Sequence, residues 1–451
     1  MDKRDIKYLE PRKTILEQIR SGLFKVILFL IIFLTIFLFL IPGFLSLVLG
    51  HDLEKIEDNK LALENIDIGD EENAFFDLEK IQEVYRGSDT FGRRIFKYLD
   101  GEDWDDTDVA EILDINKREL RYFDNAAEKD KFLLPALAEP YEGFEKVYPL
   151  GEIRAISQVA TLRALNSLRN GQDEQAFKEA LNVIKVGNLI EESQIHMVGY
   201  LVGTAIRKRG LEAMQKIINE TDVSIYRFQY YYDFLEDTKR EINTTPLKIE
   251  YLNRKTRLKN ITNGQEDMPG YEGKKAYILQ NDFYFQPNQT LNIFKERYQD
   301  LISYWQKDCS VAAEKKSPTI MIDSFFEVPK LYFTRNVVGK FYANYGVVAI
   351  NNVKNKYCQN QVLVNGLELM LEIKAHYLRN GELPELLADL DIIYEESGKI
   401  DVFSGLDFEY NKEEKILTSV GMDHELGTED DIVFDLNFGQ EEEEDAEKIE
   451  E

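Results

Sequence analysis

The stretch LNSLRNGQDEQAFKEALNVIKVG, residues 165–187, predicts two helices joined by a tight turn. Apolar residues recur on both sides of the turn at spacings of three and four, which places them on one face of each helix. These residues are Ile153, Ile156, Ala160, Ala164, Leu168, Phe177, Ala180, Leu181 and Ile184. Gly171 can adopt the left-handed backbone that ends a helix. We therefore expect an antiparallel pair over residues 150–169 and 174–190.

This pair resembles one helical hairpin of the tetratricopeptide type. A solenoid of such units needs about three stacked repeats to be stable, and only one is visible here. The pair is therefore expected to belong to a larger, mainly α-helical domain. The segment 103–123 adds an amphipathic helix, because Asp and Thr residues that favour a helix N-cap precede its apolar periodicity.

Another helix is expected over 196–218. Gly199, Gly203 and Ala205 lie within it. Small side chains at this spacing predict the close approach of a neighbouring helix rather than a ligand site.

The composition indicates a folded and strongly acidic protein. The length of 451 residues leaves room for two or three domains. Of these residues 44% are hydrophobic and 12% aromatic, as in ordinary folded proteins. The formal charge of −28 argues against a nucleic-acid partner, because phosphate binding needs clustered Lys and Arg. Two cysteines and four scattered histidines leave little basis for zinc or imidazole chemistry.

Residues 26–49, VILFLIIFLTIFLFLIPGFLSLVL, contain no charged side chain. A helix of this length spans ~36 Å, enough to cross a hydrocarbon core of ~30 Å. We predict a transmembrane helix, with the lipid bilayer as its partner. Two alternatives remain, a signal peptide cleaved after Gly50 and a buried core helix, although the run lacks the polar face of a surface-packed helix.

Charges flanking the apolar run predict its orientation. Residues 1–25 carry seven basic and four acidic side chains, and the residues after the run are mostly acidic or polar. The positive-inside rule therefore places the N-terminus in the cytoplasm and residues 50–451 on the periplasmic side of the cell membrane. The resulting organisation is a cytoplasmic segment (1–25), a transmembrane helix (26–49), a stalk (50–70), an α-helical domain (71–260), a loop or boundary (261–290), a second helical region (291–436) and an acidic disordered tail (437–451).

Residues 351–436 predict a small α+β module. A helix from about residue 351 ends near Arg379 or Asn380 at a Gly-x-Leu-Pro turn, and two short strands follow at 408–410 and 415–420. Within it, DVFSG (401–405), Tyr410 and SVGMD (419–423) resemble elements of the type II secretion major pseudopilins, although Val402 stands where that family has proline. Across residues 70–435 the chain is similar to uncharacterised planctomycete-type bacterial membrane proteins, a resemblance that implies architecture and not activity.

The pseudopilin resemblance implies a calcium-binding loop near the C-terminus. Hard oxygen ligands suited to Ca²⁺ surround Gly427. The candidate ligands are Asp423, Glu429, Asp430 and Asp431. The alternative is a solvated acidic loop. No other cofactor is expected.

Cys309 and Cys358 are candidates for one disulfide in an oxidising compartment. The alternative is two buried thiols that do not meet.

A basic cluster at Arg254, Lys255, Arg257 and Lys259 suggests either contact with anionic lipid headgroups or a solvated helix face.

No motif for nucleotide binding, zinc proteolysis or a serine nucleophile is present. The carboxylate groups at Asp105, Asp106 and Asp108, and at Glu395 and Glu396, fit helix caps or exposed loops better than acid–base catalysis. No catalytic residue is therefore predicted. The leading hypothesis is a non-enzymatic, membrane-anchored binding or scaffold protein with a protein partner. The alternatives are an accessory component of a type II secretion or pilus-like system and an unrecognised envelope hydrolase.

Overall fold

The computed structural model is mainly helical, with one small antiparallel sheet. It describes residues 15–36, 41–54, 57–84, 89–101, 104–134, 150–221, 225–267, 281–311, 333–344, 348–390 and 399–438. The chain forms two compact units. The first contains Met1–Glu57, Arg257–Phe294 and Pro318–Tyr345, and the second contains Asp58–Thr256, Lys295–Ser317 and Gly346–Glu451.

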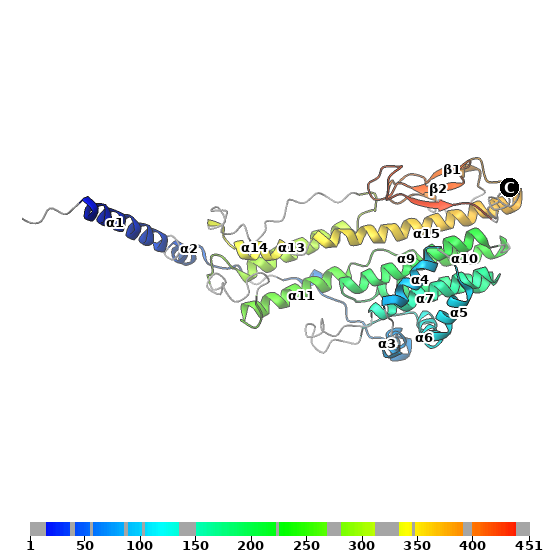
Figure 1. The fold of residues 1–451 in the computed structure, drawn as a ribbon, viewed down its shortest axis with the longest axis horizontal. Helices are drawn as coiled ribbons and strands as arrows, with labels where there is room; N and C mark the ends of the chain where they lie inside the picture. Colours follow the sequence, from blue (N-terminus) through cyan, green and yellow to red (C-terminus); the bar gives the residue numbers. More distant parts are fainter. Residues whose placement is uncertain are drawn as a thin grey trace, which may run out of the picture. The chain divides into compact units, whose positions relative to one another are not determined.

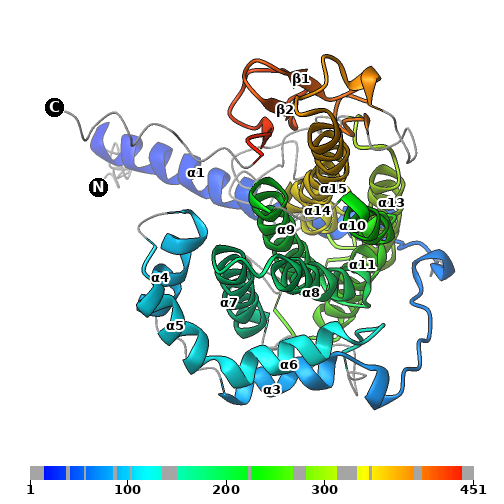
Figure 2. The same cartoon turned by 90° about the vertical axis from the view of Figure 1, so that its right-hand side faces the viewer.

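Three helices form the centre of the second unit. These are α7 (Leu150–Arg169), α8 (Asp173–Glu192) and α9 (Met197–Glu220), which pack side by side (Figure 2). The predicted helical hairpin is therefore confirmed, and α7 has the predicted bounds. Gly171 ends α7 with φ +67°, as the Asn-Gly turn indicated.

Close packing of α8 on α9 depends on glycines in both helices. An added Cβ at Gly187 of α8 would lie 2.5 Å from the backbone nitrogen of Arg207 in α9. Gly203 and Gly210 of α9 face the α8 backbone at similarly short range. The predicted close approach is therefore confirmed for Gly203. Ala205 instead lines a pocket on another side of α9.

The long helix α15 (Val348–Asn380) packs against α9 and against α10 (Ile225–Thr238). It ends at the predicted position, where Gly381 has φ +78°. Near its start, Cys358 forms a disulfide with Cys309, with the two Cα atoms 5.8 Å apart. The sequence allowed either a disulfide or two separate thiols, and the structure has the disulfide.

The sheet has the order β1–β2–β3 and lies against α15 (Figure 1). Its strands are β1 (Glu409–Asn411), β2 (Ile416–Ser419) and β3 (Ile432–Asp435). The predicted hairpin corresponds to β1 and β2, whereas β3 was not predicted. Phe434 of β3 occupies the space that a side chain at Gly366 of α15 would need, since an added Cβ there would lie 2.1 Å from the Phe434 ring.

In the described part of the second unit before α7, the helices are α3 (Phe75–Val84), α4 (Asp89–Leu99), α5 (Asp106–Ile115) and α6 (Lys117–Ala127). The single helix predicted over 103–123 is wrong, because it is divided at Asn116 into α5 and α6. The side-chain amide of Asn116 donates to the carbonyl of Ile112, a local bond that competes with helix continuation. The predicted N-cap is present, since Asp105 accepts from the amides of Thr107 and Asp108.

The first unit contains α1 (Ile15–Thr35), α2 (Ile41–Leu49) and α14 (Val337–Asn344). Helices α11 (Thr245–Thr262) and α13 (Pro287–Trp305) contribute residues to both units. The α13 N-terminus is capped from a distant part of the chain, because Asp52 accepts from the amides of Asn288 and Gln289.

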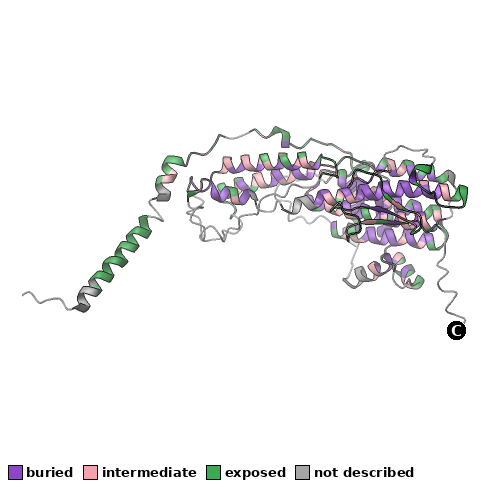
Figure 3. Ribbon diagram, turned by 90° about the horizontal axis from the view of Figure 1, so that it is seen from above, coloured by how far each residue is buried: buried purple, intermediate pink, exposed green. Residues whose placement is uncertain are grey.

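Apolar side chains of α1 are exposed around the helix (Figure 3). They include Leu23, Phe24 and every residue from Val26 to Leu34, with exposed fractions of 45% to 66%. In the structure the apolar run 26–49 is shared between α1 and α2, and residues 37–40 lie outside the described part. Among the described residues, no helix has the length and apolar content required for a membrane crossing.

Candidate functional site

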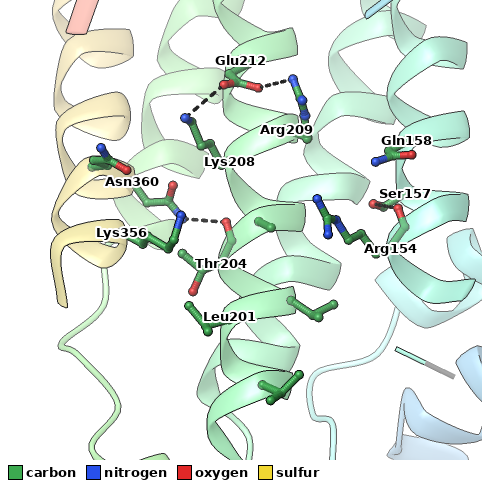
Figure 4. Close-up of a pocket in the computed structure, with 14 residues that line it drawn as sticks. Arg154, Ser157, Gln158, Leu201, Thr204, Lys208, Arg209, Glu212, Lys356 and Asn360 are labelled. Atoms are coloured by element: carbon green, nitrogen blue, oxygen red, sulfur yellow. Dashed lines mark hydrogen bonds and ion pairs between the residues drawn. The ribbon is translucent and has the colours of Figure 1, made fainter. Parts of the chain in front are cut away.

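A pocket of about 440 Å³ lies between α7, α9 and α15 in the second unit (Figure 4). Its volume falls within the ordinary range for small-molecule sites. Each helix contributes polar side chains, and α9 also supplies an apolar strip formed by Val198, Leu201, Val202 and Ala205. The pocket therefore combines polar groups from three helices with one apolar wall.

The lining of the pocket is basic although the chain as a whole is acidic. Four cations line it, Arg154 from α7, Lys208 and Arg209 from α9, and Lys356 from α15. Glu212 is the single carboxylate among the described lining residues, and it lies 3.5 Å from Lys208 and 3.0 Å from Arg209. The pocket thus carries an excess of positive charge, and no ion pair holds Arg154 or Lys356 among the described residues.

Uncharged polar groups lie deeper in the pocket. The Asn360 side chain is fully buried, and its amide nitrogen donates to the Thr204 carbonyl over 3.0 Å. The Asn360 Oδ1 atom is also buried and has no hydrogen-bond partner among the described residues. Ser157 is buried as well, and its hydroxyl donates to the carbonyl of Arg154. The Asn360 Oδ1 atom is therefore enclosed by protein and not open to the pocket.

Arg207 of α9 is buried in an ion pair, unlike the two cations that follow it. Arg207 is 1% exposed, pairs with Glu191 at 3.3 Å and donates to the carbonyl of Thr238 over 2.9 Å. Burial raises the pKa of Glu191, against the opposing effect of Arg207. The next two residues of α9, Lys208 and Arg209, line the pocket.

Three of the four predicted calcium ligands accept hydrogen bonds inside their own loop. Asp430 accepts from the amides of Met422 and Asp423, Asp431 accepts from the amide of Gly427, and Asp423 accepts from the amide of Glu425. Burial alone would raise the pKa of Asp430, but bonds from Thr428 and the backbone amides lower it. Glu429 is exposed.

Within the described part of the chain, no group of three or more His, Cys, Asp or Glu side chains is placed to hold a metal ion. Hydrogen bonds from the loop's own backbone amides to these carboxylates explain how the acidic loop is held. Calcium binding stays a prediction.

Asp401 joins the two sequence elements on which the pseudopilin resemblance rests. Its buried carboxylate accepts from the amide of Phe403, the hydroxyl of Ser419 and the amide of Val420, over 3.0, 2.8 and 3.2 Å. A single carboxylate therefore connects the loop before β1 to the end of β2. This contact is structural, because all of its partners belong to the module itself.

The acidic groups considered for catalysis have other partners. Asp105 caps α5, Asp106 accepts from the indole of Trp104, and Asp108 pairs with Arg94 and accepts from Tyr98. Bonds from Arg94 and Tyr98 lower the pKa of Asp108. Glu395 and Glu396 lie outside the described residues.

Two other carboxylates, both on α15, have strongly raised pKa values. Burial raises the pKa of Glu368 to about 8, although Lys239 lies 2.8 Å away. Burial raises the pKa of Glu372 to about 7, with Lys399 opposing the change. Neither residue lines the pocket. Desolvation is the largest cause of both shifts, and it accounts for them without an acid–base role.

The basic cluster 254–259 is partly used in ion pairs. Lys255 lies 2.6 Å from Asp58, and Arg257 lies 2.6 Å from Glu266. Burial alone would raise the pKa of Asp58, but bonds from Lys255 and Tyr251 lower it. These pairs account for two of its four cations, and headgroup contact stays a prediction.

The pocket was not predicted from the sequence. One local signal was present, the run Arg207-Lys208-Arg209 in an otherwise acidic chain. Arg154 and Lys356 are 202 positions apart in the numbering, so their contribution depends on how α7 and α15 flank α9. In comparisons with known proteins, no protein family, curated protein or solved structure matches the chain.

Proposed function

We propose that the chain is a membrane-anchored binding protein of a bacterial envelope, without catalytic activity, whose second unit binds its partner at the α7–α9–α15 pocket. In this proposal residues 26–49 hold the chain in the lipid bilayer, the N-terminus is cytoplasmic and the bulk of the chain is periplasmic. The observation that carries the binding role is the basic pocket, in which Arg154 and Lys356 form no ion pair with any residue that the structure describes.

The exposed apolar surface of α1 supports the anchor. A helix with apolar side chains on all sides is stable when buried in protein or lipid, because water would solvate that surface unfavourably. Side chains from Val26 to Leu34 are instead exposed in the structure. Lipid is the environment that would cover them on every side.

Liposome flotation tests the anchor. Replacing Leu30 and Phe33 with arginine would cost about 2.5–3.5 kcal/mol each in the hydrocarbon core, so the double variant should no longer float with vesicles of phosphatidylethanolamine and phosphatidylglycerol. The control carries the same two charges at Leu406→Arg and Leu426→Arg, which are exposed positions of the second unit. The anchor is refuted if the unmodified chain does not float or if both double variants float equally well.

The pocket favours binding over catalysis. Of the lining residues that the structure describes, one is a carboxylate, which is paired with two cations, and none is histidine or cysteine. The remaining groups can hold and orient a ligand through charge and hydrogen bonds. Turnover of a panel of ester, amide and glycoside substrates that is abolished by Glu212→Gln would contradict a purely binding role.

A second candidate is an accessory role in a type II secretion or pilus-like system. The specific observation in its favour is the Asp401 contact, which brings together the two elements that resemble pseudopilins. Co-purification from detergent-solubilised membranes tests it. Recovery of pseudopilins with the chain, and their loss in an Asp401→Asn variant, is the expected result, and the absence of secretion components would refute it.

A further inference from the structure

The pocket between α7, α9 and α15 is elongated along α9. Its α9 residues extend from Val198 to Glu212, which corresponds to ~21 Å of helix. They lie at spacings of three and four and so form one stripe, in which Val198, Leu201, Val202 and Ala205 are followed by Lys208 and Arg209. Val198 is exposed, and the other three apolar residues are half-buried. The pocket therefore has an open apolar end and a basic end.

The two walls of the pocket are polar, and each contains one exposed cation. The α7 wall is formed by Arg154, Ser157 and Gln158, and the α15 wall by Lys356, Gln359 and Asn360. Figure 4 shows these walls on opposite sides of α9. Neither Arg154 nor Lys356 forms an ion pair with a residue that the structure describes. Because these cations lie on different walls, they suit a ligand that carries several separate anionic groups.

We propose that the pocket receives one face of an acidic amphipathic helix from a partner protein. Apolar side chains of the partner pack on the strip from Val198 to Ala205, and acidic side chains on its flanks pair with Arg154 and Lys356. Two helices pack through residues at spacings of three and four, which is the spacing of the α9 stripe. The inference rests on the proposed binding function and names the class of partner.

The charges in the pocket identify the sign of the partner. The Glu212 carboxylate lies within ion-pair distance of both Lys208 and Arg209, so a carboxylate is already accommodated at the basic end. Each acidic side chain of a partner is a small anion, and it responds to the nearby cations because more distant exposed charges are screened. A second copy of the chain is disfavoured as the occupant, since each copy carries a charge of −28 and the two repel one another.

The shape of the pocket favours a helix over an anionic bilayer surface. Ser157 and Thr204 line the pocket although both are buried, so part of the lining is recessed between the helices. A broad bilayer surface would contact the exposed ends of the walls and leave the recessed part empty. A row of side chains from one helix face fills such a space.

Fluorescence anisotropy of a labelled peptide with the full-length protein in detergent tests the proposal. The probe is a stapled helix of about four turns, the length of the α9 stripe, with leucines on one face and glutamates on both flanks. A matched probe has glutamine in place of each glutamate, and detergent micelles alone give the background. We expect the glutamate probe to bind about tenfold more tightly, because only its side chains form ion pairs with the two walls.

Paired variants test the role of the wall cations. Arg154→Gln/Lys356→Gln should weaken binding of the glutamate probe about tenfold and leave the glutamine probe unchanged, because the lost contacts are ion pairs. The matched control, Lys117→Gln/Lys178→Gln, removes two exposed cations outside the pocket. This control should bind both probes like the unmodified chain.

A second pair of variants tests the apolar end. Val198→Ser should weaken binding of both probes, because it removes an apolar contact that does not depend on charge. Ile115→Ser changes an exposed apolar residue outside the pocket and should weaken neither probe. Equal effects of the two substitutions would overturn the proposed docking of the partner's apolar face.

Other outcomes would overturn the acidic partner helix. These are no binding of either probe, equal affinity for the two probes, or equal loss in both double variants. Tighter binding of monomeric short-chain phosphatidylglycerol than of the glutamate probe would make a lipid the occupant. Self-association that is lost in Arg154→Gln/Lys356→Gln would make a second copy the occupant. Turnover that is abolished by Glu212→Gln would instead refute the proposed function and leave the affinities of the two probes unchanged.

Discussion

Substituting Gly187 with alanine should destabilise the second unit, because α8 and α9 leave no room for a methyl group there. The added Cβ would lie 2.5 Å from the backbone nitrogen of Arg207, and 2.7 Å from both its Cα and its Cβ. None of these atoms can move by a simple change of rotamer. The helices would have to separate by roughly 1 Å to restore ordinary contact distances of about 3.5 Å between heavy atoms.

Two opposing effects set the magnitude. Overpacking of a tight interface costs about 1–3 kcal/mol, and alanine regains about 1 kcal/mol over glycine in a helix. Displacing α9 at Arg207 also disturbs its buried ion pair with Glu191, a type of contact that is strongly destabilising to break. We therefore expect a net loss of about 2 kcal/mol in the free energy of unfolding.

Urea unfolding of the full-length protein in detergent, followed by far-ultraviolet circular dichroism, measures this loss. Gly151→Ala is the control, because its Cβ on α7 would meet nothing within 4 Å. It should be neutral or stabilising. The nearest backbone atoms would lie 2.8 Å from a Cβ at Gly210 and 2.9 Å from one at Gly203, so these variants should lose less stability than Gly187→Ala. The reasoning is refuted if Gly187→Ala is as stable as Gly151→Ala.

Three further predictions concern the second unit. Reducing the Cys309–Cys358 disulfide should lower the free energy of unfolding by about 4 kcal/mol, because the bond closes a loop with a sequence separation of 49. A Cys309→Ser/Cys358→Ser variant should not respond to reductant. The pKa of Glu372 is raised to about 7 in the folded protein. Between pH 4.5 and 7 the folded protein therefore keeps a proton on Glu372 that the unfolded chain loses. The free energy of unfolding should fall with rising pH in this range, by at most about 1.4 kcal/mol per pH unit. Urea midpoints at pH 5, 6 and 7 should show a smaller slope in Glu372→Gln, and equal slopes would contradict the assignment. Lys374→Met should lower the free energy of unfolding by about 3 kcal/mol in the same urea assay, because the buried ammonium donates to three carbonyls at the end of α9. A loss below 0.5 kcal/mol, as expected for a surface substitution, would disprove that role.

Local sequence signals predicted the helices well where the turn chemistry agreed with the apolar pattern. The bounds of α7 follow from its periodicity and from the Asn170-Gly171 turn, which both indicate the same end. The 103–123 segment shows the limit of this reasoning, since its apolar periodicity continues through Asn116 whereas the α-helix is interrupted there. At this position the side-chain amide of Asn116 donates to the carbonyl of Ile112 in the preceding turn, a local bond that competes with helix continuation.

Contacts between distant segments were harder to predict. The hairpin of β1 and β2 is local, but β3 pairs with β2 across the acidic loop, with Ile432 opposite Ser419. The carboxylates of that loop suggested metal ligands because their oxygen chemistry suits calcium. In the structure the same oxygens accept from loop amides, a use that depends on backbone geometry and leaves no signature in composition.

The pocket was the least predictable feature for the same reason. The net charge of the chain is strongly negative, and this charge argued against a large anionic partner such as a nucleic acid. A small anion responds to the local charge instead, since exposed charges more than about 8–10 Å away are largely screened at physiological salt. The local charge here depends on Arg207 being buried while Lys208 and Arg209 face outward, and on α7 and α15 lying on either side of α9. Net charge therefore limits which macromolecules such a chain can bind, whereas the arrangement of its helices decides which small ligands it can hold.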